Sequence, residues 1–194
     1  MLIYLVRHGE DKNDNLTKLG KKQIKLLAKT FKNTKFDAFY SSPLNRCLQT
    51  SNIINKTTKC NIVVDDRIKE RFKLDHKPKT DHEKDWYNNY LNLDFESKTL
   101  ECCKDFFARV FSFLDDVCKN KKQSNVLVVA HSALSYAFIN YFCKTDCNIA
   151  TWSSMANGSC IRFEFNQDWL SKADYVQKVE KNGDLYRLRI LVLG

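Results

Sequence analysis

Two histidines in this sequence each follow an apolar run of the kind that forms buried strands. Residues 2–6 (LIYLV) precede Arg7-His8-Gly9, and residues 125–130 (NVLVVA) precede His131. Because polar side chains cannot continue a buried strand, both histidines are expected where the chain leaves a sheet. Open α/β folds bind ligands at the carboxyl ends of their strands. A neutral ring nitrogen placed there can act as a nucleophile.

Two further candidate residues follow predicted strands. Residues 36–41 (FDAFYS) predict a strand that ends before Ser42-Pro43, where Ser42 is expected to cap a helix whose first turn holds Pro43. Arg46 then falls in the opening turn of that helix. Residues 60–65 (CNIVVD) predict a short strand, and Glu70 comes within five residues of it.

The alternation of helical and strand patterns predicts an α/β fold with a mostly parallel sheet. In such a sheet the carboxyl ends of neighbouring strands meet at one edge, so the candidate residues are expected to converge. Two arginines and a helix N-terminus would bind a dianionic phosphate. One histidine can attack phosphorus, the arginines and the second histidine can stabilise the equatorial oxygens, and Glu70 can protonate the leaving oxygen.

Composition limits what this site can belong to. The 194 residues are expected to form a single domain, 1–194, with an irregular excursion over the sheet edge at about 66–98. A net charge of +9 favours anionic ligands, although most of the lysines are expected to be ordinary solvated surface residues. No specific nucleic-acid binding is expected. The sequence has no pattern that fixes an oligomeric state.

The cysteines and the apolar segments indicate the compartment. The eight cysteines are scattered without a CxxC pair, so they are interpreted as reduced thiols. No run approaches the length of a membrane span, and no signal-peptide pattern precedes the first strand. A cytoplasmic protein without membrane attachment is therefore expected.

Five motifs occur in a familiar order: LIYLVRHGE, LTKLGKKQ, YSSPLNRCLQTS, VVDDRIKE and VLVVAHS. In these motifs the chain resembles the histidine phosphatase superfamily, the relatives of cofactor-dependent phosphoglycerate mutase, from Leu2 to about Ser159. The resemblance implies a three-layer αβα fold and a mechanism without metal or other cofactor. It also implies that His8 is the phosphorylated nucleophile and Glu70 the proton donor. Arg7, Arg46 and His131 would bind the phosphoryl group.

The sequence also departs from this family. Asp11 stands where relatives usually have Thr, and Asn13 stands one position earlier than the family's Asn. The loop before LTKLG is short, which favours a more open mouth. Ser132 replaces the Gly that commonly follows the second histidine, and the segment after Phe72 does not match the family's pattern.

Several assignments have alternatives. Asp75, Glu83 or Glu101 could deliver the proton instead of Glu70 if the excursion folds back. His76 and His82 could be metal ligands, but they lack partners at ligand spacing and are more simply surface residues. Cys47 is either an oxidisable thiol near the pocket or a buried helix cysteine. The aromatic residues Trp86, Tyr87 and Tyr90 either cover the core or line a substrate wall.

The sequence predicts a metal-independent phosphatase that hydrolyses phosphate monoesters through a phosphohistidine on His8. Its partner would be an anionic phosphorylated substrate, either a small molecule or a phosphoprotein. A phosphoglycerate mutase-type phosphotransferase uses the same residues, but it must enclose a bisphosphorylated cofactor. A non-catalytic phosphate-binding module of the same fold is the third hypothesis.

Overall fold

A computed structural model describes residues 1–71, 101–120, 122–143, 155–166, 169–179 and 185–190 of the chain. In this part of the chain, one mixed sheet contains seven strands in the order β5-β4-β6-β1-β7-β8-β9. Their bounds are β1 (Leu2–Arg7), β4 (Ala38–Ser41), β5 (Ile62–Val64), β6 (Asn125–Ala130), β7 (Cys160–Asn166), β8 (Trp169–Val179) and β9 (Leu185–Ile190). Strands β5, β4, β6 and β1 are parallel, and β7, β8 and β9 continue the sheet in antiparallel pairs.

The parallel half of the sheet contains the two strands that precede the histidines. Strands β1 and β6 are neighbours, and their register pairs Val6 with Val129 and Arg7 with Ala130. Their apolar side chains are buried on both faces, as expected for central strands of a parallel sheet. His8 and His131 therefore leave the sheet side by side at the same edge.

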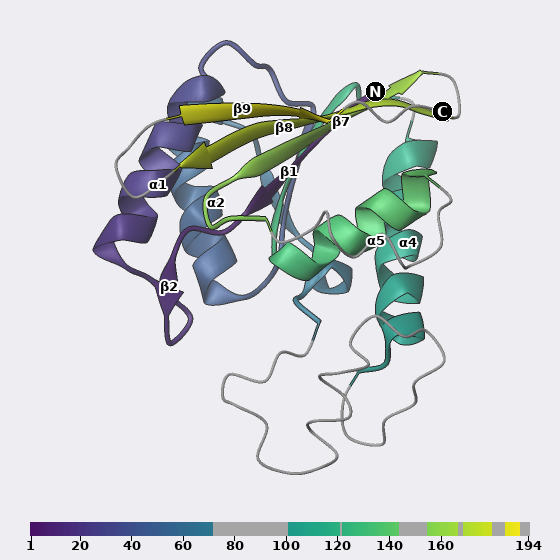
Figure 1. The fold of residues 1–194 in the computed structure, drawn as a ribbon, viewed down its shortest axis with the longest axis horizontal. Coiled ribbons are helices and arrows are strands. Elements are labelled where there is room, and N and C mark those ends of the chain that lie inside the picture. The colour runs from purple at the N-terminus through teal and green to yellow at the C-terminus, as the bar shows by residue number, and fades with distance from the viewer. Residues whose placement is uncertain (72–100, 121, 144–154, 167–168, 180–184, 191–194) are drawn as a thin grey trace.

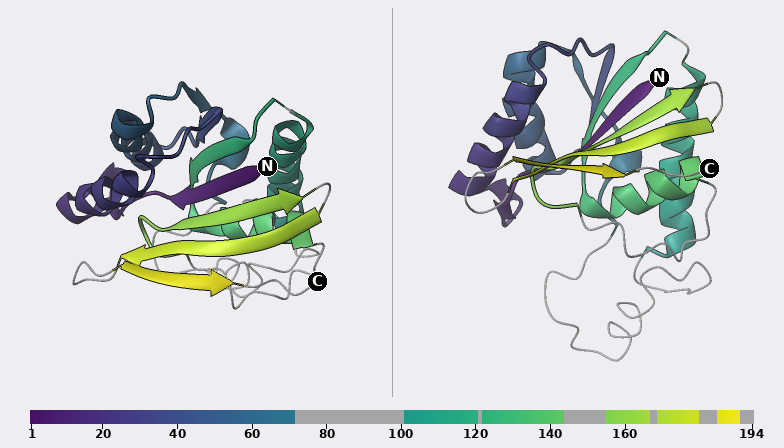
Figure 2. Two further views of the ribbon diagram at one scale, coloured as in Figure 1. Left: turned by 90° about the horizontal axis from the view of Figure 1, so that it is seen from above. Right: turned by 45° about the horizontal axis from the view of Figure 1, so that its top comes forward.

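Helices cover both faces of the sheet, so the expected three-layer αβα arrangement is confirmed. Helices α1 (Lys18–Thr30) and α2 (Asn45–Thr58) lie on one face, and α4 (Cys103–Lys119) and α5 (Ser132–Cys143) lie on the other (Figure 1). A short 3-10 helix, η1 (Asp66–Ile68), follows β5. Figure 2 shows β7, β8 and β9 extending the sheet beyond β1.

Two separate apolar clusters hold the layers together. Alternate residues of β1 divide between them: Ile3 and Leu5 pack with α4 and α5, whereas Tyr4 and Val6 pack with α1 and α2. Because successive side chains of a strand point to opposite faces, each central strand contributes to both clusters. The site is thus built on strands that are fixed from both sides.

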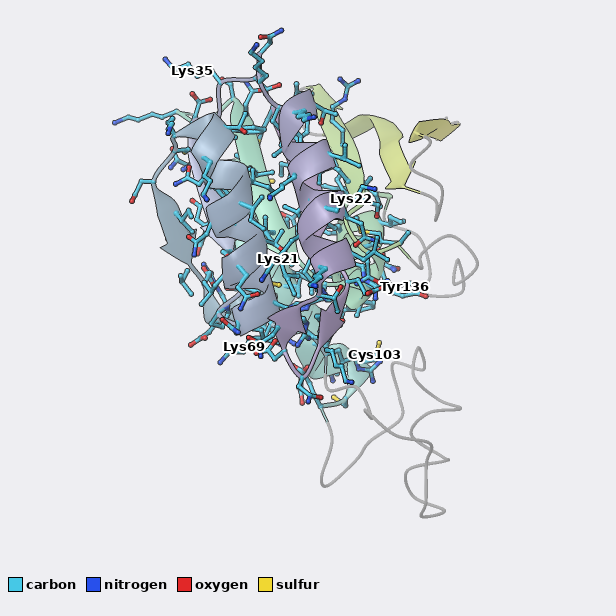
Figure 3. The ribbon with its side chains drawn as sticks, turned by 90° about the vertical axis from the view of Figure 1, so that its left-hand side faces the viewer. Lys21, Lys22, Lys35, Lys69, Cys103 and Tyr136 are labelled. Carbon is cyan, nitrogen blue, oxygen red and sulfur yellow. The ribbon has the colours of Figure 1, made fainter. Side chains whose placement is uncertain are left out.

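Helix α1 is amphipathic and begins with a side-chain cap. Thr17 is its N-cap, and the Thr17 side chain accepts a hydrogen bond from the Gly20 backbone N–H at 3.0 Å. The apolar face of the helix is buried, and its lysines face solvent. Lys21 and Lys22 lie on the outer face of α1, which runs beside α2 in Figure 3. These lysines belong to a solvated basic surface, as the composition predicts.

Gly9 and Gly20 allow the loop after β1 to pack closely against α1. A Cβ atom on Gly20 would lie 2.0 Å from the Glu10 carbonyl oxygen, and one on Gly9 would lie 2.6 Å from the Gly20 oxygen. Both glycines are therefore required by close backbone approach. The backbone of Gly9 does not adopt a positive φ.

The structure adds or corrects three details. The polar segment after Glu10 is a small hairpin of β2 (Asp11–Lys12) and β3 (Asn15–Leu16), not an irregular loop. Helix α2 begins at Asn45, with Leu44 as its N-cap, so Ser42 is not the N-cap and Pro43 does not lie in the first turn. Strand β8 was not expected from the sequence.

Some predictions lie outside the described residues. These include most of the excursion at about 66–98, with Asp75, His76, His82, Glu83 and the aromatic residues from Trp86 to Tyr90. Within the described ranges, no helix combines the length and the hydropathy needed to cross a membrane.

Candidate active site

The backbone around His8 is fixed by three neighbouring segments. Its own N–H donates to the Ala130 carbonyl at 3.1 Å, and its carbonyl accepts from the Gly158 N–H at 2.9 Å. The Gly9 N–H donates to the Thr50 hydroxyl of α2 at 3.2 Å. His8 as a whole is 4% exposed. The histidine is therefore held by β6, by the loop before β7 and by α2.

The hydrogen bonds of His8 define which ring nitrogen carries the proton. Nδ1 lies 2.8 Å from the Gly9 carbonyl oxygen, which can only accept, so Nδ1 must be protonated. Nε2 accepts from Arg46 Nε at 3.1 Å. Burial, together with the charges of Arg46 and Arg7, lowers the pKa of His8 to about 3. At neutral pH the ring is uncharged, with a lone pair on Nε2.

Arg46 joins the two histidines. It lies in the first turn of α2, where its Nε donates to His8 Nε2 and its Nη2 donates to His131 Nδ1 at 3.3 Å. Its Nη1 donates to Asp14 Oδ1 at 2.8 Å. A guanidinium with these directions can turn two arms towards the oxygens of a phosphoryl group bound between the histidines.

His131 is fully buried and has a different hydrogen-bonding environment. Its Nε2 lies 2.8 Å from the Ser42 hydroxyl. Because an arginine can only donate, Nδ1 is the acceptor of the Arg46 bond, and Nε2–H therefore donates to Ser42. Burial, with His8 and Arg46 nearby, lowers the pKa of His131 well below its ordinary value. The ring centroids of the two histidines are 5.3 Å apart.

Cys47 packs directly beside His131. Its sulfur lies 3.5 Å from His131 Nε2 and 3.4 Å from the Ala130 carbonyl oxygen. Burial raises the pKa of the Cys47 thiol far above its ordinary value. The residue therefore lies beside the site as a buried, protonated helix cysteine rather than as a reactive thiolate. In the part of the chain whose side chains are described, all six cysteines are free thiols.

Arg7 reaches the site from the end of β1. Its Nη1 donates to the Met155 carbonyl oxygen, and its backbone N–H donates to the Ser159 oxygen at 3.0 Å. Its charge lowers the pKa of both His8 and His131, after burial and the other charges around them. Arg7 thus lies close enough to both histidines to contribute to one anionic site.

Glu70 lies at the same edge of the sheet. It is half-buried, and its Oε1 accepts from the Arg71 N–H at 3.1 Å. After burial and the effects of Arg46 and Ser42, the charge of Glu70 also helps to raise the pKa of Cys47. The structure therefore brings this carboxylate near the His131 side of the site.

Arg109 of α4 binds the carboxylate of Glu101, the alternative to Glu70 as proton donor. Arg109 binds the Glu101 carboxylate with Nε at 2.5 Å and Nη2 at 2.8 Å. The same guanidinium donates to the backbone oxygens of Arg67, Lys69 and Glu70. A carboxylate held by two N–H groups of one guanidinium is not free to turn towards a leaving oxygen. Glu70 and Glu101 are the two candidate proton donors that lie in the described residues, and Glu70 is therefore the better one.

The sequence patterns do not indicate the roles of several residues of the site. Asp14 accepts from Arg46, Ser42 bonds His131, and the loop with Met155 and Gly158 holds Arg7 and His8. The Asn13-Asp14 pair was the available signal for the hairpin, because both residues adopt a positive φ, 49° and 60°. The backbone carbonyl of Met155 had no signal in the sequence.

Comparisons with known proteins agree with this architecture. The model of the histidine phosphatase superfamily (branch 1) matches residues 3–175. The chain belongs to this superfamily, and the predicted family is confirmed.

Phosphoserine phosphatase 1 of Hydrogenobacter thermophilus is 29% identical over 154 residues, which are 67% of this chain and 70% of that protein. GpmB of Enterobacter sp. (strain 638), named as a probable phosphoglycerate mutase, is 24% identical over 96% of this chain and 94% of its own. The family relatives thus carry the names of both phosphatases and mutases.

Solved structures share the fold. The alpha-ribazole phosphatase of Shigella flexneri superimposes with a TM-score of 0.78 at 18% identity, covering 100% of this chain and 98% of its own. A phosphoserine phosphatase of Entamoeba histolytica, in complex with phosphoserine, superimposes with a TM-score of 0.69 at 20% identity, covering 89% and 95%. At these identities the likeness establishes the fold.

Proposed function

We propose that this protein hydrolyses phosphate monoesters through a phosphohistidine on His8. The observation that supports this proposal is the hydrogen bonding of His8: Nδ1 lies against the Gly9 carbonyl oxygen, and Nε2 accepts from Arg46. A neutral imidazole with one nitrogen fixed as donor leaves the other as a nucleophile. The family membership and the phosphatase names among the relatives support the same reaction.

In the first step, the lone pair of His8 Nε2 attacks phosphorus and the bond between phosphorus and the ester oxygen breaks. The leaving oxygen takes a proton from Glu70, which becomes a carboxylate. Arg46 and Arg7 stabilise the charge on the equatorial oxygens. In the second step, water attacks the phosphohistidine, its proton goes to Glu70, and orthophosphate leaves with His8 Nε2 regenerated.

His131 acts as a hydrogen-bond donor to the phosphoryl group. The Ser42 hydroxyl can donate as well as accept, so it can bond His131 Nε2 with its own proton. His131 Nδ1 can then carry the proton and donate a hydrogen bond to a phosphoryl oxygen once Arg46 turns to the substrate. A dianion beside the ring also raises the pKa of His131 and favours its protonated form.

The substrate is proposed to be a small phosphorylated molecule. Relatives named for phosphoserine support this class, whereas a phosphoprotein substrate is the alternative. A mutase activity is the second candidate, favoured by the similarity to GpmB. A non-catalytic phosphate-binding module predicts binding without turnover.

The first test is hydrolysis of p-nitrophenyl phosphate by the wild type and by Glu70→Gln, with and without EDTA. Wild-type turnover that survives chelation supports the metal-independent phosphatase. Glu70→Gln should slow O-phosphoserine by about a hundredfold or more, and the activated aryl ester much less, because only the poor leaving group needs the proton. Equal losses on both esters would reassign the donor. Binding without turnover would favour the module, and phosphoryl exchange between phosphoglycerates would favour the mutase.

A further inference from the structure

The β2–β3 hairpin places an acidic side chain on the anion-binding groups of α2. Asp14 Oδ2 accepts from the Asn45 N–H at 3.0 Å, and Oδ1 accepts from the Arg46 N–H at 3.3 Å. Arg46 Nη1 donates to the same Oδ1 at 2.8 Å. A carboxylate thus already occupies the N-terminus of α2 and one arm of the arginine assigned to the phosphoryl group.

This placement is built into the local structure. Asn13 and Asp14 form the turn of the hairpin with positive φ angles, and the Asn45 side chain binds the Asp14 carbonyl at 3.1 Å and Asn15 at 2.9 Å. The Asp14 side chain is 40% exposed, so part of it faces solvent. Burial raises the pKa of Asp14, but its bonds from Arg46 and Asn45 outweigh that effect and lower the pKa. Asp14 is therefore ionised at neutral pH.

A second carboxylate lies on the other nitrogen of the nucleophile. Asp11 Oδ1 is 3.4 Å from His8 Nδ1, and its side chain is 24% exposed. The hairpin therefore lines the His8 side of the site with negative charge, although the chain as a whole carries a net charge of +9. Like charges at short range oppose the binding of a dianion, and the opposition grows if the ligand has a second anionic group.

We propose that Asp14 is a specificity-determining residue. It lowers the affinity of the site for phosphate and selects against substrates with a second anionic group. The inference rests on the proposed function. Bound phosphate must share Arg46 with a carboxylate that stays within hydrogen-bonding reach. A cationic group near the phosphate offsets this repulsion, so phosphate esters of amino alcohols are the favoured class. Bisphosphorylated esters, and carboxylated esters without a neighbouring cationic group, are disfavoured. Weak retention of orthophosphate also suits a hydrolase, which must release its product.

The test begins with orthophosphate binding, measured by calorimetry for the wild type and Asp14→Asn. Asn tolerates a positive φ and keeps one oxygen for the α2 N–H groups, so it removes the charge together with one of the two acceptor oxygens. Asp14→Asn should bind orthophosphate about tenfold more tightly. Asp14→Gly, which also tolerates this φ, should shift in the same direction and serves if Asp14→Asn folds poorly. Asp116→Asn on α4 is the matched control, because it makes the same charge change at a residue 64% exposed on the opposite face of the sheet.

Kinetics then test the selectivity. For Asp14→Asn, kcat/KM on 3-phosphoglycerate should rise about tenfold, while kcat/KM on O-phosphoethanolamine should change about twofold or less. Orthophosphate binding by Asp14→Asn that is equal to or weaker than that of the wild type, or not measurable for either, overturns the proposal. Equal gains on both substrates overturn its selectivity. The binding assay needs no turnover, so an inactive wild type would refute the proposed hydrolysis separately.

Discussion

His8 and His131 leave two adjacent strands in matching register, yet their surroundings differ. Both rings are buried, and burial lowers the pKa of each. The Nδ1 of His8 faces a backbone carbonyl, which can only accept a hydrogen bond. The Nε2 of His131 faces the Ser42 hydroxyl, which can donate or accept. The first arrangement fixes one tautomer, whereas the second allows either once Arg46 turns from His131 to the substrate.

This difference explains how one pair of histidines can divide two tasks. A nucleophile needs a lone pair on one defined nitrogen throughout the reaction, and a carbonyl partner provides it. A residue that binds the phosphoryl group must become a donor when substrate arrives, and a hydroxyl partner permits that change. The partners, rather than the strand positions, assign the roles.

The largest expected effect comes from His8→Ala. Loss of a covalent nucleophile should reduce kcat by about four orders of magnitude or more. Steady-state hydrolysis of p-nitrophenyl phosphate measures the loss, and orthophosphate titration serves as the control for an intact site. Activity within about tenfold of the wild type would mean that the two histidines do not differ as described.

His131→Gln should have a smaller effect than His8→Ala. Glutamine retains a hydrogen-bond donor but cannot gain positive charge, so kcat should fall by about a hundredfold. The phosphoenzyme should still form in a rapid-quench experiment, only more slowly. Complete loss of phosphoenzyme in His131→Gln with phosphoenzyme retained in His8→Ala would reverse the roles.

Ser42→Ala tests the proposed change of tautomer. Without the hydroxyl, His131 Nε2 loses its donor and acceptor partner, and kcat should fall by about tenfold. Ser51→Ala is the control, because this buried hydroxyl bonds Ser41 and not a histidine. Both variants should lose about 1 kcal/mol of stability. Equal kcat values for the two variants would contradict a special role for Ser42.

The last prediction concerns the pH dependence of folding rather than activity. The folded-state pKa of His8, about 3, lies below the ordinary value of 6.5, so between these values the unfolded chain binds a proton that the folded protein does not. The free energy of unfolding should therefore fall as the pH falls through this window. His8→Gln should reduce the slope. Denaturant unfolding at several pH values measures it, and an unchanged slope would show that the folded ring is protonated like the unfolded one.

The sequence predicted the strand exits better than it predicted the contacts made there. His8, Arg46 and His131 could be placed because each follows a recognisable strand or begins a helix. Ser42 was assigned to helix capping because a hydroxyl that can cap a helix can equally bind a histidine. The position of the Asp14 side chain depends on a turn with two positive φ angles. The Met155 carbonyl that accepts from Arg7 lies 148 positions after Arg7 in the chain. Such long-range backbone contacts leave no pattern in side-chain types.

The most direct test of the central claim is to trap the phosphoenzyme. Wild-type protein is mixed with O-phosphoserine, quenched in alkali where phosphohistidine survives, digested, and analysed by mass spectrometry with phosphohistidine isomer standards. The account predicts phosphate on His8 at Nε2, formed at least as fast as steady-state turnover. Phosphate on His131, phosphate on His8 Nδ1, or turnover without any phosphohistidine would contradict it.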